Sequence, residues 1–189
     1  MPFVFNRYSG LLLIFFVHGL VYALLLLHRS IKHDQVSDRW LALFLLLCIL
    51  FICPWMLGFA GWYDGINCLP CRNIMFYMPM QQSLLMGPVI YFYLKALCYP
   101  SVPFRKKEAL HFLPAALYLG WSATVFVTDR LLLGEYYLMN GVTDPDLDDW
   151  YVTAGLVSLL VYLVICFRLY TKYRQFIVEQ ISFADAVTF

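Results

Sequence analysis

Five long apolar stretches limit what this chain can fold into. A helix needs about 20 mostly apolar residues to cross the hydrocarbon core of a bilayer. The stretches lie at residues 8–27, 40–60, 74–97, 110–128 and 150–167. Because 62% of the 189 residues are hydrophobic and only 13% are charged, too few polar side chains remain to cover a core in water. The sequence therefore predicts an all-α, polytopic membrane helix bundle with five transmembrane helices, formed by residues 1–167.

The distribution of charge predicts how this bundle is oriented. Cytoplasmic loops of membrane proteins carry an excess of Lys and Arg. With the N-terminus outside, the inner segments are 28–39, 95–109 and 168–189, and they hold ten of the 13 Lys and Arg residues. Seven of the 12 acidic residues fall in the outer segments. We therefore expect an outside N-terminus and a cytoplasmic C-terminus.

The last segment, 168–189, has apolar residues at helical spacing. We interpret it as a cytoplasmic amphipathic linker that continues into further sequence. The alternative is a surface helix lying on the inner leaflet, with Arg168, Lys172 and Arg174 close to the lipid headgroups.

The third stretch is the most irregular of the five. Pro79 and Pro88 each remove a backbone hydrogen bond that neighbouring groups must replace in lipid. Gln81 and Gln82 lie about 10 Å below the outer surface if the helix rises by about 1.5 Å per residue. Two adjacent amides at that depth either line a ligand pocket in the bundle or hold neighbouring helices together. They are the candidate ligand-binding residues, and the static interpretation remains open.

Cys68 and Cys71 form a Cys-x-x-Cys pair in a predicted outer loop, where they can form a disulfide. This placement resembles quinone-coupled membrane thiol oxidases. Those enzymes need a second cysteine pair in their other outer loop to pass electrons on. Residues 129–150 contain no cysteine, so a structural disulfide or two free thiols is the simpler interpretation.

The sequence predicts neither an enzyme nor a cofactor. It contains no nucleotide-binding glycine loop, no His-Glu-x-x-His and no Gly-x-Ser-x-Gly. The centres of the five stretches lack the acidic residue that ion-coupled transporters usually carry. Two cysteines without an outer-loop histidine are too few for a zinc site, so no metal is expected.

Six short motifs resemble, in their order, the N-terminal membrane region of bacterial AraC-type helix-turn-helix regulators. The resemblance extends from about residue 8 to residue 189. The motifs are GFAGWYD (58–64), MPMQ (78–81), GPVIYFYLK (87–95), KEALHFLP (107–114), DLDDWY (146–151) and SFAD (182–185).

The resemblance implies a sensor in the bacterial inner membrane. In that family about seven helices lead into a cytoplasmic DNA-binding domain, and this chain of 189 residues has neither the last two helices nor a helix-turn-helix. The implied partners are the lipid bilayer, a small-molecule or envelope signal, DNA through the missing domain, and a second copy in a homodimer. Two alternatives remain open: the input region of another signalling protein such as a sensor kinase, and a freestanding thiol oxidoreductase using Cys68 and Cys71.

Overall fold

The computed structural model describes residues 3–62, 80–100, 102, 104–134 and 150–187, and over these residues the chain is helical without strands. The all-α prediction is therefore confirmed for the described residues. The α-helices are α1 (Arg7–His33), α2 (Val36–Phe59), α4 (Ser83–Cys98), α5 (Leu113–Val127) and α6 (Trp150–Val187). The 3₁₀ helix η1 (Lys106–Phe112) leads into α5, and the π-helical η2 (Thr128–Leu133) continues it.

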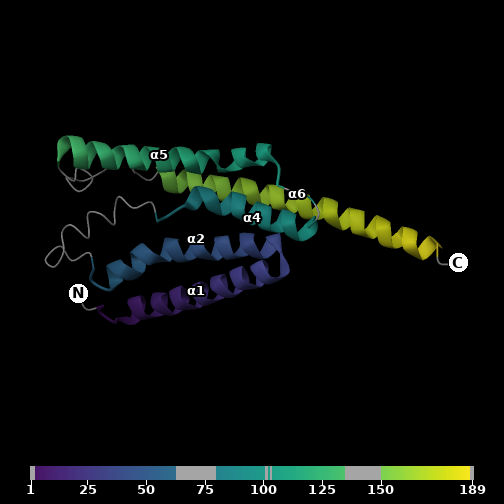
Figure 1. Cartoon of the computed structure of the whole chain (residues 1–189), viewed down its shortest axis with the longest axis horizontal. Helices are drawn as coiled ribbons and strands as arrows, with labels where there is room; N and C mark the ends of the chain where they lie inside the picture. Colours follow the sequence, from purple (N-terminus) through teal and green to yellow (C-terminus); the bar gives the residue numbers. More distant parts are fainter. Residues whose placement is uncertain (1–2, 63–79, 101, 103, 135–149, 188–189) are drawn as a thin grey trace.

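The helices lie side by side along one common direction (Figure 1). α1 packs on α2, α2 packs on α4, and α4 packs on α6. α6 starts beside the other helices and then projects far beyond them. We call the end from which α6 projects the exit end; it contains the turn between α1 and α2, the end of α4, and η1. The opposite end, where α1, α4 and α6 begin, is the far end.

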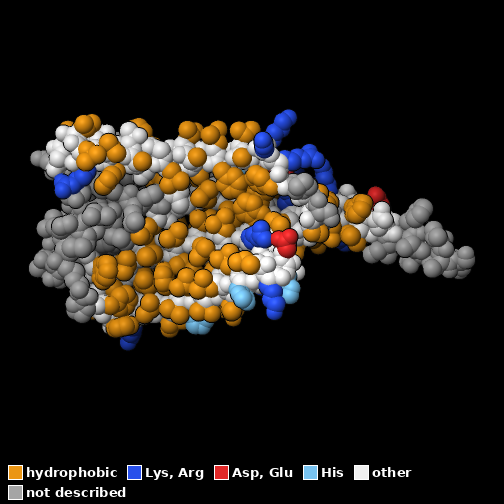
Figure 2. Space-filling view, viewed as in Figure 1, with side chains coloured by type: hydrophobic (Ala, Val, Ile, Leu, Met, Phe, Trp, Pro, Cys, Tyr) orange, Lys and Arg blue, Asp and Glu red, His pale blue; other side chains and the backbone are white. Residues whose placement is uncertain are grey.

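Within the described part of the chain, four helical segments are long and apolar enough to cross a membrane. They are Arg7–His33, Val36–Phe59, Lys106–Leu133 and Tyr151–Gln180, with mean hydropathies of 2.5, 2.6, 1.4 and 2.2. Their large apolar side chains mostly point outward, as Leu24, Leu117 and Leu163 do. Figure 2 shows hydrophobic side chains over the length of the bundle, and Lys, Arg and His side chains mainly near the exit end. This exterior suits contact with lipid rather than water.

The third predicted span is shorter than expected. Residues 80–82 are not helical, and α4 begins at Ser83 instead of near residue 74. Gln82 precedes the first turn with φ −87° and ψ 60°, outside the helical region, and its N–H bonds the Met80 carbonyl at 3.2 Å. At about 1.5 Å per residue, the 16 residues of α4 cover about 24 Å, less than the roughly 30 Å of a bilayer core. Residues 74–79 lie outside the described residues.

The last helix is longer than the predicted span of 150–167. α6 has 38 residues and passes the predicted boundary between bundle and linker, at residues 167 and 168, without a break. Its length is about 57 Å, nearly twice the thickness of a bilayer core. The segment that we interpreted as an amphipathic linker is helical up to Val187 and continues the packed part of α6 directly.

Small residues allow the helices to approach closely. A Cβ at Gly155 of α6 would lie 2.2 Å from Ser83 Oγ of α4, and a Cβ at Gly87 would lie 2.6 Å from Tyr162 Cδ2 of α6. Ser83 and Gly87 are four residues apart and so share one face of α4. Helices in lipid associate through close contacts of this kind, because lipid tails are as apolar as the side chains they would bury.

Candidate functional site

An aromatic cluster joins three elements near the exit end. Its centre is Phe92 of α4, which is only 2% exposed. Its ring centroid lies 5.1 Å from that of Trp40 in α2, 5.4 Å from that of Phe112 in η1, and 5.2 Å from that of Phe104, which precedes η1. The rings of Phe92, Trp40 and Phe112 are nearly parallel, with interplanar angles of 25° and 17° to Phe92. Packing of this kind stabilises a contact beyond its buried area.

A hydrogen bond connects this cluster to α6. His111 Nδ1 of η1 lies 2.7 Å from the Tyr162 hydroxyl, 51 positions further along the chain. The Tyr91 ring lies beside both, 5.5 Å from His111 and 6.2 Å from Tyr162 between centroids. On the other side, the Tyr162 ring fills the space that the missing side chain of Gly87 leaves. Tyr162 is therefore held from two sides, by η1 and by α4.

An ion pair lies one turn further along α4. Lys95 Nζ contacts a carboxylate oxygen of Glu108 in η1, and the two side chains are only 15% and 18% exposed. The second carboxylate oxygen of Glu108 accepts a hydrogen bond from the Arg105 N–H at 3.2 Å. Because Tyr91 and Lys95 are four residues apart, one face of α4 presents both to η1. We call Tyr91, Phe92, Lys95, Glu108, His111, Phe112 and Tyr162 the junction.

The α1–α2 turn is held by a second polar network at the same end. Arg29 Nε and Nη2 donate to the two carboxylate oxygens of Asp38, at 2.5 and 2.8 Å. Ser30 Oγ donates to the Gln35 carbonyl at 2.8 Å and accepts from Arg39 Nε at 3.0 Å. The Asp38 carboxylate is buried, and a bidentate guanidinium pairs both of its oxygens. These contacts hold the end of α1 against the start of α2.

The candidate ligand-binding amides lie at the far end, away from the junction. Gln82 is 6% exposed and Gln81 is half-buried. The next residue, Ser83, packs against Gly155 of α6. One turn before Gly155, the buried Tyr151 stacks on Tyr118 of α5 with 3.6 Å between ring centroids. Gln82 thus stands where α4 and α6 meet tightly, and its predicted role in ligand binding remains a prediction.

The remaining candidate residues lie outside this arrangement. Cys68 and Cys71 fall outside the described residues. Among the described cysteines, four have free thiols: Cys48, Cys53, Cys98 and Cys166. Within the part of the chain that the structure describes, no group of three His, Cys, Asp or Glu residues is placed to hold a metal ion.

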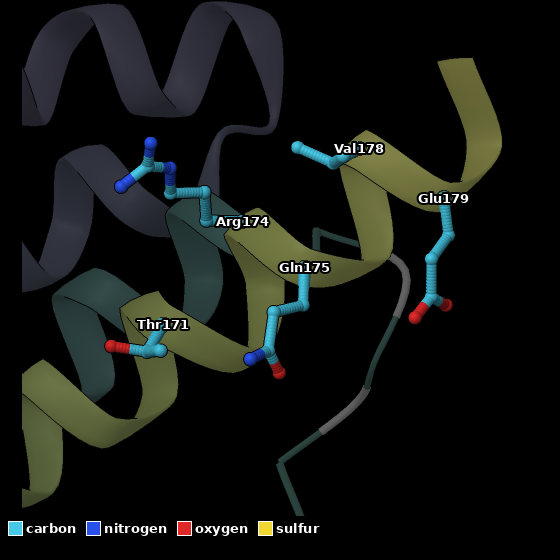
Figure 3. A pocket seen from close by; sticks show the side chains of 5 residues that line it. All are labelled: Thr171, Arg174, Gln175, Val178 and Glu179. Atoms are coloured by element: carbon cyan, nitrogen blue, oxygen red, sulfur yellow. The ribbon is translucent and has the colours of Figure 1, made fainter. Parts of the chain in front are cut away.

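A shallow hollow runs along the projecting part of α6. Thr171, Arg174, Gln175, Val178 and Glu179 line it (Figure 3). All five residues come from about two and a half turns of the same helix, so no second element lines the hollow. It lacks the concave, mostly apolar walls of a small-molecule site.

The residue patterns along the chain did not single out the junction as a site. A signal was nevertheless present, because two of the six motifs that carry the family resemblance, 87–95 and 107–114, supply six of its seven residues. These motifs are separate in the sequence and lie against one another in the structure through Lys95 and Glu108, and through Phe92 and Phe112.

Over the residues that the structure describes, the fold and this site define an all-helical protein with four helices suited to crossing a membrane. No family model matches the chain, and no curated protein or solved structure matches it either.

Proposed function

We propose that this chain is the membrane-embedded input region of an AraC-type transcriptional regulator, with α6 as its output element. In this proposal five spans cross the inner membrane of a bacterium, and the N-terminus lies outside. The third of these spans contains α4. A signal met outside or within the bilayer is relayed to a cytoplasmic DNA-binding domain that follows residue 189.

One observation carries the proposal: α6 runs without a break from the junction into the projecting segment. Tyr162 fixes α6 to α4 and η1, and Val187 lies 25 residues further on, about 37 Å along the helix axis. A continuous helix transmits rotation and displacement of its packed part to its free part. Two alternative packings at Tyr162 would therefore present the projecting segment in two orientations, and a ligand that favours one packing would shift the population.

Residue insertions in the projecting helix test whether its rotation carries the signal. Inserting two alanines after Gln175 rotates everything beyond them by about 200°, whereas seven alanines restore the phase to within about 20°. We expect the two-residue insertion to abolish the transcriptional response of the full protein in its own cells. The seven-residue insertion should largely retain that response although it is longer. A response that falls steadily with insertion length, without dependence on phase, would contradict the proposal.

The size of the native protein tests the AraC assignment. An antibody raised against residues 144–149 can detect the protein in its own cells. We expect a band well above the 22.1 kDa of this chain, because the regulator carries its DNA-binding domain in the same polypeptide. A band at 22.1 kDa would exclude direct transcriptional control by this protein.

Reporter fusions test the orientation. A periplasm-active reporter fused after residue 146 should be active, and the same reporter fused after residue 34 should be inactive. The reverse pattern would overturn the proposed topology.

A further inference from the structure

The exit end carries two groups of exposed cations that form no ion pair within the described residues. Three cations there have carboxylate partners: Arg29 with Asp38, Arg39 with Asp34, and Lys95 with Glu108. The first group without such a partner precedes and opens η1, and the second lies on α6. They consist of Arg105, Lys106 and Lys107, and of Arg168, Lys172 and Arg174.

The tertiary structure brings the two groups to the same place. The ring of Tyr99, just after α4, meets the ring of Tyr173 on α6 edge to face, with 5.6 Å between centroids. The α6 turn that carries Lys172 and Arg174 therefore lies beside the connection that leads to Arg105. The groups are more than 60 positions apart in the sequence, and Figure 2 shows Lys and Arg side chains gathered near this end.

Both groups lie next to a run of exposed apolar residues. On α6, the exposed side chains of Leu163, Val164 and Phe167 come directly before Arg168. On the other segment, Lys106 and Lys107 come shortly before the exposed Leu110 and Leu113. Long cationic side chains at such a boundary keep their charge at the level of the headgroups while their stems cover apolar surface.

We propose that these six cations form a binding surface for anionic phospholipid headgroups. A phospholipid fits because the apolar helix surface and the cations adjoin one another. Its acyl chains can lie along the apolar helices while its phosphate contacts the cations. A soluble phosphate would gain only the second contact. Each Lys or Arg near an anionic surface strengthens the attraction by about fivefold.

The test uses the full chain in nanodiscs of phosphatidylcholine containing a minor share of phosphatidylglycerol. The lipids that stay bound are counted by native mass spectrometry. We expect the unmodified chain to retain phosphatidylglycerol in preference to phosphatidylcholine. Changing all three cations of either group to Gln should reduce this preference by about a hundredfold, and high salt should reduce it as well.

A matched pair of single variants separates a local effect from a change in total charge. Arg174→Gln should lower the preference by about fivefold, whereas Arg7→Gln, which changes an exposed arginine at the far end, should leave it unchanged. If a triple variant fails to fold, as judged by circular dichroism, these single variants still decide the question. An equal preference in Arg174→Gln, Arg7→Gln and the unmodified chain would overturn the proposal.

A second arm separates lipid from free phosphate. Inorganic phosphate is added to the chain in nanodiscs of phosphatidylcholine alone, and the midpoint of thermal unfolding is compared with that in nanodiscs containing phosphatidylglycerol. We expect a rise only with the anionic lipid. An equal rise with inorganic phosphate would show that the surface binds phosphate as such, which would refute a lipid site.

Discussion

The contact between Gly87 and Tyr162 determines how closely α4 and α6 pack, so Gly87→Ala should destabilise the bundle. The new Cβ would lie 2.6 Å from Tyr162 Cδ2, 3.0 Å from its Cγ and 3.1 Å from its Cβ. Carbon atoms pack best at about 3.5–4.0 Å, so the two helices must separate or the ring must move by about 1 Å. The ring cannot move freely, because its hydroxyl bonds His111 and its face lies beside Tyr91.

The size of the effect follows from opposing contributions. Overpacking of this kind costs about 1–3 kcal/mol. If the ring moves away, loss of the hydrogen bond to His111 adds about 1 kcal/mol. Alanine is a better helix former than glycine, which offsets up to about 1 kcal/mol. We therefore expect the free energy of unfolding to fall by about 1–3 kcal/mol.

The measurement is unfolding of the full chain in mixed micelles, followed by circular dichroism. Gly120→Ala on α5 is the matched control, because nothing lies within 4 Å of the Cβ that it adds. That variant should be neutral or up to about 1 kcal/mol more stable. In a Tyr162→Ala background the clash is absent, so Gly87→Ala should then cost little, and the double-mutant cycle should give a coupling of at least about 1 kcal/mol. If Gly87→Ala matched Gly120→Ala in stability, the proposed close contact would be refuted.

Three further predictions concern the polar contacts near the exit end, measured by the same unfolding assay. Tyr162→Phe removes the hydrogen bond to His111 and should lower the free energy of unfolding by about 1 kcal/mol. Tyr170→Phe, at an exposed position of the same helix, should have no effect. Equal effects of the two variants would contradict the proposed contact at the junction. Lys95→Met leaves the mostly buried Glu108 carboxylate without its cation and should lower the free energy of unfolding by about 2 kcal/mol. The double variant Lys95→Met/Glu108→Gln should be less destabilised. If it lost as much stability as the two single variants together, the ion pair would be refuted. Asp38→Asn weakens the bidentate contact with Arg29 and should cost about 1–2 kcal/mol. Asp34→Asn, at a position that is 89% exposed and has φ +50°, should be neutral or slightly stabilising, because asparagine tolerates the left-handed region well.

The sequence alone determined that the protein is helical and where several of its helices begin or end. These features depend on the length and apolar content of each stretch. Length and apolar content predicted helices starting near residues 8 and 150, and α1 and α6 begin at Arg7 and Trp150. The second stretch was expected at 40–60 and α2 spans Val36–Phe59. Among the described helical segments, four have the length and composition to cross a membrane, whereas the apolar stretches predicted five spans.

The late start of α4 and the unbroken length of α6 could not be predicted in this way. Apolar residues stand on both sides of Gln82, yet the backbone of Gln82 lies outside the helical region and α4 begins only at Ser83. Residues 168–180 are polar enough to resemble a linker, but no proline or glycine interrupts them, and α6 continues through to Val187.

The contacts that form the junction were visible only in the tertiary structure. His111 and Tyr162 are 51 positions apart, and neither residue has a spacing that indicates its partner. The contact between His111 and Tyr162 depends on two other residues. Gly87 has no side chain and so leaves room for the Tyr162 ring, and Lys95 of α4 forms an ion pair with Glu108 of η1. In lipid, apolar surface does not by itself select which helix faces meet, so that choice is made by shape and by a few polar contacts. Those contacts form only after the helices are in place, which is why the pattern of residues along the chain did not reveal them.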